Sequence, residues 1–444
     1  MIGGAAFLLD APLVSASFDA QGLRPFLHAG FWTPMCLALA ALIGAWRLHR
    51  AAERDAAQLS GWMDFERLSQ VLLAWGAGWW LFALIGEIVR FVPLPERPGI
   101  ALLAIAASVA LFSLLALRER WQALATACFG LGPLALVVLA LSDWQAPPLA
   151  QWGWLGWGAW LAVHLWSLRR LEQGVAANVL RAAHVLGCWL LLGVLALEAR
   201  ALLASLADQH NAWRWLGWAL VPSLFLILLG LRERLPWPVA GRELEYRGIA
   251  AAPVALVLLA WFWLVNLFSD GAADPLPYLP LLNPLELGML IVLAAIVQWL
   301  RSGPRLLGVD LVQHARPLQA LIGASLFALL TLAVCRTAHH WLAVPFDADA
   351  LVASMAVQAG LSIVWALIAL ALMIVGHLRG RRDLWLVGAG LIGVVVAKLF
   401  FVELGNSGSL ERIVSFIGVG VLMLVVGYFA PLPPKRSEEE PTPA

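Results

Sequence analysis

The sequence places a single lysine inside an apolar run, VVVAKLFFVEL over residues 394–404. Only two of the 29 basic residues are lysines, and an ammonium can lose its proton on burial whereas a guanidinium cannot. An ionisable group deep in such a run usually faces the interior of a helix bundle and serves a function. Small residues at four-residue spacing beside it favour close helix packing: Ala389, Gly393 and Ala397. We therefore expect Lys398 to face protein and to form a polar binding site.

Two further charges follow Lys398 along the chain. Glu403 stands at the end of the same run, and Arg412 begins the next run after the turn GNSGS. Glu403 is about 140° around a helix from Lys398, so these two need a distorted turn to touch, whereas Glu403 and Arg412 can meet across the turn. We assign both to the binding site. Whether these charges bind a ligand or only pair with one another stays open at this point.

A second group of candidate residues lies in and just before the segment HHWLAVPFDADA. Arg336, His339 and His340 are assigned as further residues of the polar binding site. Asp347 and Asp349 form the D-x-D pattern with which some sugar transferases hold a metal. Two aspartates around one alanine arise easily by chance, so they are weak metal candidates. No cofactor is expected.

The composition indicates which elements must position these residues. The 444 residues are 62% hydrophobic and 13% charged, with a mean hydropathy of +0.83, whereas an ordinary soluble domain is about 25% charged. The apolar residues recur in runs of about twenty, the length that crosses a hydrocarbon layer of roughly 30 Å. Because lipid offers no partner to backbone amides, such runs must be helical. The sequence therefore predicts an all-α fold, a polytopic transmembrane helix bundle.

Thirteen spans are predicted between the charged and Pro- or Gly-rich breaks. They cover residues 26–46, 71–89, 99–117, 121–141, 152–168, 179–199, 213–231, 249–268, 285–300, 317–336, 355–377, 384–404 and 412–430. The sequence GLGP around Pro133 predicts a kink in the fourth of them. Together they form one transmembrane domain over residues 1–431, followed by a polar tail over 432–444 that we expect to be disordered and cytoplasmic.

The basic residues support this number of spans. With the residues before the first span placed outside, 21 of the 29 basic residues fall in inside loops and seven in outside loops. Lys and Arg accumulate on the cytoplasmic side, and a missed span would scramble the alternation from that point onward. The C-terminus is therefore expected in the cytoplasm.

Several other polar residues inside the spans are expected to be structural. Glu87 precedes Arg90 by three residues, which predicts a local ion pair on one helix. His164 and His184 are single imidazoles on apolar helices and are expected to be core residues. The four cysteines fall singly in apolar runs and are interpreted as small buried residues.

The last ninety residues, from PFDADALVASMAVQAGLSIVWALIALAL through VVVAKLFFVELGNSGSLERIVSFIGVGVLM, resemble the C-terminal portion of an uncharacterised bacterial multi-span family, the domain of unknown function 2339. The central PLLNPLEL is similar to it as well, so the resemblance spans most of the chain and is strongest from Pro345 onward. The resemblance implies a multi-pass protein of the bacterial inner membrane, in longer chains with further N-terminal spans. The family usually has an aspartate where Glu403 stands. No activity comes with it.

Three hypotheses for function follow. The leading one is a non-enzymatic membrane protein, transporter-like or translocation-associated, that binds a lipid or small molecule at Lys398. The second is a membrane-embedded transferase acting on a lipid-linked or sugar substrate through Asp347 or Asp349. The third is a scaffold or sensor whose charges only lock helices together. The lipid bilayer is the expected partner, with further membrane subunits, and the absence of a basic block argues against nucleic acid.

Overall fold

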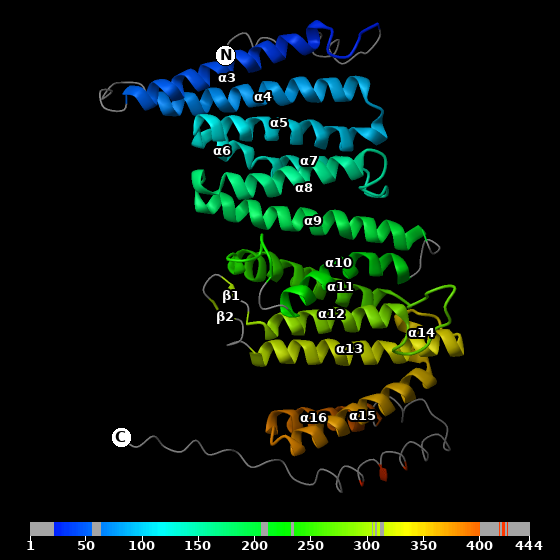
Figure 1. Cartoon of the computed structure of the whole chain (residues 1–444). Coiled ribbons are helices and arrows are strands. Elements are labelled where there is room, and N and C mark those ends of the chain that lie inside the picture. Colours follow the sequence, from blue (N-terminus) through cyan, green and yellow to red (C-terminus); the bar gives the residue numbers. More distant parts are fainter. Residues whose placement is uncertain are drawn as a thin grey trace, which may run out of the picture. The chain divides into compact units, whose positions relative to one another are not determined.

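The structure is a computed structural model (Figure 1). It describes residues 22–55, 64–205, 212–231, 235–303, 305–306, 309–310 and 315–399, with the single positions 417, 420, 421 and 424. The predicted tail over 432–444 and nearly all of the predicted last span lie outside the described residues, as do Glu403 and Arg412.

The chain folds into two compact units. Most helices lie wholly within one unit or the other, while α10, α11 and α12 are divided between them. The first unit contains α3 (Ala29–Asp55), α4 (Phe65–Phe91), η1 (Leu94–Glu96), α5 (Arg97–Glu119), α6 (Gln122–Cys128), α7 (Leu131–Leu141), α8 (Gly153–Arg170), η2 (Glu172–Gly174), α9 (Ala177–Ser205), most of α10 (Ala212–Leu231), the π-helical turn η3 (Leu244–Ala250), and the short strands β1 (Arg305–Leu306) and β2 (Val309–Asp310), which pair antiparallel. The second unit contains most of α11 (Ala251–Phe268), most of α12 (Pro284–Arg301), α13 (Ala315–Leu342), α14 (Ala348–Ala353), α15 (Met355–Leu378) and α16 (Arg382–Lys398).

The predicted all-α, multi-span fold is confirmed. Within the described residues each of the first twelve predicted spans coincides with a helix or a pair of helices. Ten of these segments are long and apolar enough to cross a membrane. The span count of thirteen is therefore approximate, and the Trp-rich α8 and the 17-residue α16 are outside those ten.

The fourth predicted span is broken, as its proline suggested. The first piece, α6, ends at Cys128 and the second, α7, begins at Leu131. Pro133 has no backbone N–H, and its ring clashes with the carbonyl four residues earlier, which belongs to Phe129. The break therefore falls before the proline, where that helical hydrogen bond is lost.

Close helix packing in the first unit depends on glycine. Helix α5 packs along α8. Helix α3 likewise packs along α4 (Figure 1). A Cβ built on Gly156 of α8 would lie 2.6 Å from the carbonyl oxygen of Gly99 on α5, so neither backbone has room for a side chain there. The neighbouring Trp157 and Trp160 are buried and belong to an apolar core that also contains Leu102 of α5.

Helices α15 and α16 pack against each other differently from the prediction. The close approach is at Gly388, where a Cβ would lie 2.7 Å from the carbonyl oxygen of Ala369. The buried face of α16 continues through Ile392 and Val395. Of the predicted small-residue stripe, Ala389 packs against the core that contains Ile392, whereas Gly393 and Ala397 are exposed and a Cβ on Gly393 would meet nothing within 4 Å. Gly388 lies one position along the helix from that stripe, which rotates the packed face by about 100°.

The α5–α8 contact yields a matched pair of variants. We expect Gly156→Ala to lower the free energy of unfolding by about 1–3 kcal/mol, because a methyl group must displace the α5 backbone. Gly158→Ala is the control, since a Cβ on Gly158 of the same helix meets nothing within 4 Å. Denaturant unfolding in mixed micelles measures both. Equal stability of the two variants would contradict the described packing.

Candidate functional site

The most deeply buried charges in the described part of the chain are Arg336 on α13 and Glu286 in the first turn of α12. Both side chains have no exposed surface, and the Arg336 Nη1 lies 3.4 Å from the Glu286 Oε1. The guanidinium also donates from Nη2 to the backbone oxygen of Asn266 at 2.7 Å and to its Oδ1 at 3.1 Å. Its Nε donates to the Ser269 carbonyl oxygen at 3.0 Å. The charge is therefore held by the end of α11 as well as by its carboxylate partner.

Glu286 takes two further hydrogen bonds from the loop that precedes it. Its Oε1 accepts from the Tyr278 hydroxyl at 2.8 Å, and its Oε2 accepts from the backbone N–H of Leu281 at 2.6 Å. The local sequence explains this placement. Asn283 caps α12 by accepting from the N–H of Leu285, Pro284 occupies the first helical position, and Glu286 falls in the first turn, where a carboxylate is favourable.

Loop residues 269–283 cover the guanidinium of Arg336. Gly271 has a φ of +81°, which favours glycine, and a Cβ there would lie only 3.0 Å from the Arg336 Cδ. Both the backbone conformation and the lack of space therefore favour glycine at this position. The Asn283 Nδ2 donates to the Gly271 carbonyl oxygen at 2.8 Å, which ties the two ends of the loop together. The indole of Trp341 donates to the Tyr278 carbonyl oxygen at 3.2 Å. The loop therefore has fixed anchors on α12 and α13.

The electrostatics of this cluster favour a permanent ion pair. A guanidinium stays charged in proteins, and its burial is tolerable only beside an opposite charge. Burial and the neighbouring Glu286 carboxylate raise the pKa of Tyr278 well above its usual value near 10, so its hydroxyl remains a neutral donor. Within the described residues one buried polar atom of the cluster, the Asn266 Nδ2, has no hydrogen-bond partner. The arrangement can fix a loop, and its charges are already neutralised by one another.

The structure places His339 and His340 beside this cluster. The ring of His340 stacks on Tyr278 at 4.5 Å between centroids, and its Nε2 lies 2.9 Å from the Asp270 carbonyl oxygen. His339 instead contacts the Val344 carbonyl oxygen through Nδ1 at 2.7 Å. Arg336, His339 and His340 thus lie together at one end of α13, and their assignment to a binding site stays a prediction.

Asp347 and Asp349 lie at the start of helix α14. The Asp347 Oδ1 accepts the backbone N–H of Ala350 at 2.9 Å and so caps α14, while Asp349 lies in the first turn of that helix. In the part of the chain that the structure describes, no three His, Cys, Asp or Glu side chains gather in a way that could hold a metal ion.

Lys398 lies at the end of α16 and is half-buried. Its Nζ donates to the Gln358 carbonyl oxygen and to the Ser362 Oγ, both at 2.8 Å and both on α15. The ammonium is thus turned toward the neighbouring helix. Its contacts on α15 are distinct from those of Arg336, which involve α11, α12 and the loop between them.

A second buried carboxylate, in the first unit, has the same kind of setting. Glu87 on α4 accepts the backbone N–H of Phe26 at 2.9 Å through Oε2. Its Oε1 pairs with the Arg90 Nη1 at 3.1 Å, which confirms the predicted local ion pair, and with the His28 Nε2 at 2.7 Å. Here too, a glutamate at a helix end holds the loop before a long helix.

A third example in the same unit lacks the buried arginine. Glu198 on α9 accepts the backbone N–H of Leu149 at 3.1 Å. In all three cases the donor residue directly follows a proline, which has no N–H of its own and fixes φ. These prolines are Pro25, Pro148 and Pro280. Anchoring of a proline-containing loop by a buried or partly buried glutamate therefore recurs along the chain.

The sequence alone did not identify Asn266, Ser269 and Tyr278 as partners of Arg336. The usable signal was the motif NPLE over residues 283–286, a helix start with an acid in its first turn. The two predicted core histidines behave as expected: His164 stacks on Trp160, and the His184 Nδ1 lies 3.0 Å from the Tyr246 hydroxyl. Cys128 and Cys335 are buried, whereas Cys36 is exposed, contrary to the prediction for it.

The long apolar helices and the paired charges between them define an α-helical membrane protein of the multi-span class. Residues 5–433 match the family described as predicted membrane protein (DUF2339), and the chain belongs to that family. The resemblance is thus confirmed, over nearly the whole chain. No curated protein and no solved structure matches. The protein accordingly resides in a lipid bilayer.

The buried pair can be tested by a double-mutant cycle. Arg336→Met should lower the free energy of unfolding by about 3–5 kcal/mol, because it leaves the Glu286 charge buried without a counter-ion. Adding Glu286→Gln should recover a large part of this loss, since the neutral amide oxygen still accepts from Tyr278 or Leu281.

The control for this cycle is Arg381→Met, which breaks the exposed Arg381–Asp383 pair at 2.6 Å. An exposed pair contributes about 1 kcal/mol or less. Denaturant unfolding in mixed micelles measures the wild type, Arg336→Met, Glu286→Gln, the double variant and Arg381→Met. A loss for Arg336→Met no larger than that for Arg381→Met would contradict the burial and pairing of Arg336.

Proposed function

We propose that this protein is a non-enzymatic membrane scaffold, built to hold a fixed surface at one face of the bilayer. The observation that carries the proposal is the Arg336–Glu286 pair, in which both charges are fully buried and satisfied by protein groups. A transport or catalytic group must be reachable by its substrate, whereas these groups are enclosed beneath their own loop. A buried pair whose hydrogen bonds are all made within the protein can fix the geometry of the elements that it joins.

The anchored loop also offers a surface that a partner can use. Leu276, Leu279 and Leu282 in the loop are exposed, as are Trp341 and Leu342 at the end of α13. Rigid apolar residues next to fixed backbone suit contact with lipid or with a further membrane subunit. The proposal places the protein in the bacterial inner membrane, with its arginine-rich loops and C-terminus in the cytoplasm and this surface outside.

A second candidate function keeps the transporter-like hypothesis for Lys398. The observation that favours it is a half-buried ammonium at a helix–helix seam, within 2.8 Å of a backbone oxygen and a hydroxyl. On this hypothesis Lys398 binds an anionic solute together with Glu403 and Arg412. The transferase hypothesis has less support, because Asp347 is engaged in capping α14.

One experiment separates scaffold from transporter. The melting temperatures of the wild type and Lys398→Met are compared in detergent with and without acetate, succinate and phosphate as anionic probes. The scaffold proposal expects Lys398→Met to melt several degrees lower under every condition, because only helix packing is lost. Ser362→Ala is the control, since it removes one hydrogen bond and keeps the charge.

A probe that stabilises the wild type and Ser362→Ala but not Lys398→Met would contradict the scaffold proposal and favour solute binding. Lack of any probe effect, combined with a lower melting temperature for Lys398→Met, is the result that the scaffold proposal expects.

A further inference from the structure

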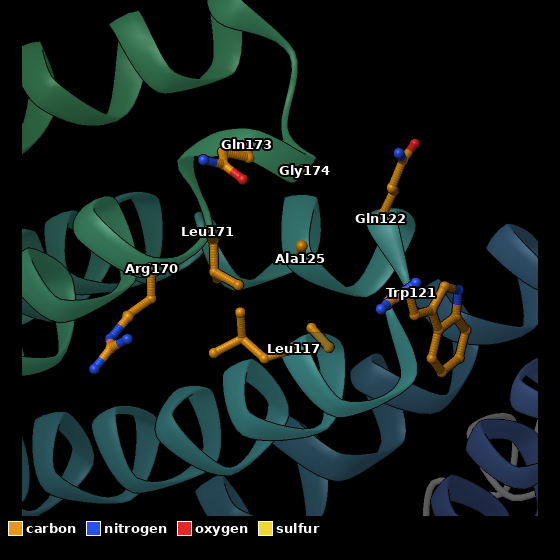
Figure 2. A pocket seen from close by; sticks show the side chains of 10 residues that line it. Leu117, Trp121, Gln122, Ala125, Arg170, Leu171, Gln173 and Gly174 are labelled. Atoms are coloured by element: carbon orange, nitrogen blue, oxygen red, sulfur yellow. The ribbon is translucent and has the colours of Figure 1, made fainter.

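A cavity of about 320 Å³ opens between two helix turns of the first unit. One turn joins α5 to α6, and the other joins α8 to η2 (Figure 2). Its walls are Ala116, Leu117, Arg120, Trp121, Gln122, Ala125, Arg170, Leu171, Gln173 and Gly174. Neither the proposed scaffold surface nor the Arg336 cluster uses any of these residues.

The lining of this cavity is amphipathic. Leu117 and Leu171 lie on facing elements across it, with Ala125 beside them (Figure 2). Arg120 and Arg170 are exposed residues of the lining, and the Arg170 side chain extends outward from it (Figure 2). Gln122 and Gln173 carry amides that can donate hydrogen bonds. Apolar walls with cationic donors around them match a ligand that has a hydrocarbon part and an anionic part.

The two arginines have no carboxylate partner within the described part of the chain, because nearby acids are paired elsewhere. Glu119 accepts from the Arg50 Nη2 at 2.5 Å and from the Trp46 indole at 3.0 Å. Glu172 pairs with Arg242. The cavity therefore carries about two uncompensated positive charges.

The backbone at Arg120 supports a role for its side chain. Arg120 terminates α5 with a φ of +52°, in the left-handed region where helices commonly end on glycine. A side chain with Cβ is disfavoured in that conformation. Glycine at this position would end the helix with less strain and would lack the guanidinium.

The cavity lies at an end of the helices that is suited to lipid headgroups. The neighbouring contacts, between Arg50 and Glu119 and between His49 and Trp121, join the ends of α3, α5 and α6 at this same side. These turns belong to the loops in which the sequence concentrates arginine, the side that faces the anionic leaflet in the predicted topology.

From the cavity, its two uncompensated guanidinium groups and its apolar wall, we infer that this site binds the phosphodiester headgroup of an anionic phospholipid. Arg120 and Arg170 donate to the phosphate oxygens, since a guanidinium presents paired N–H groups that match them. Leu117 and Leu171 contact the glycerol and the first acyl carbons. No covalent step is involved.

The test measures binding of short-chain phosphatidylglycerol to the purified full chain in neutral detergent, by native mass spectrometry, with short-chain phosphatidylcholine as the uncharged reference. Arg120→Gly and Arg170→Gln should each weaken phosphatidylglycerol binding about fivefold, and the double variant about twenty-five-fold. Phosphatidylcholine binding should not change. Arg118→Gln is the matched control, because Arg118 is the exposed neighbour that does not line the cavity.

Three outcomes would overturn the inference. The first is phosphatidylglycerol binding that is equal in the wild type and the double variant. The second is an equal loss in Arg118→Gln, which would indicate only a diffuse surface charge. The third is competition by millimolar inorganic phosphate at the same arginines, which would assign the site to a soluble phosphate. Arg120→Gly should melt no lower than the wild type, because glycine relieves the backbone strain there, and Arg170→Gln provides the independent variant if it does.

Discussion

A charge inside an apolar helix bundle must be neutralised by the protein itself, because neither lipid nor packed side chains can solvate it. The Arg336–Glu286 pair meets this requirement with no exposed surface on either side chain. To do so it recruits the end of α11 and the loop that leads into α12. The pair thereby converts a proline-rich connection into a fixed part of the structure, and the arrangement of the second unit's loop depends on it.

The same requirement is met in smaller ways elsewhere. Glu87 and Glu198 in the first unit also accept the backbone N–H of the residue after a proline, and Glu87 has Arg90 and His28 as partners. A buried or partly buried glutamate is thus a repeated means of holding the loops at the predicted outer ends of helices. The uncompensated arginines at the opposite end of the first unit differ sharply from this pattern. We therefore propose a structural role for the glutamates and a lipid site for Arg120 and Arg170.

The sequence predicted the helices well, because run length and backbone hydrogen bonding leave few alternatives for apolar segments of this size. It also predicted Glu87–Arg90, a contact within one helical turn. It could not predict Arg336–Glu286, since those residues are 50 positions apart and their contact depends on which helices become neighbours. The face of α16 was misassigned by one residue at Gly388, because small residues occur on more than one side of that helix. The grouping of Lys398 with Glu403 and Arg412 stays a prediction.

The central claim is that the buried carboxylate of Glu286 fixes the loop above it. Hydrogen exchange of the Leu281 backbone amide, measured on the intact protein in nanodiscs, tests this directly. Leu281 lies outside any helix, yet its N–H donates to the Glu286 Oε2. The account predicts exchange nearly as slow as for the interior amides of α12. Exchange at the rate of an unstructured peptide would contradict it.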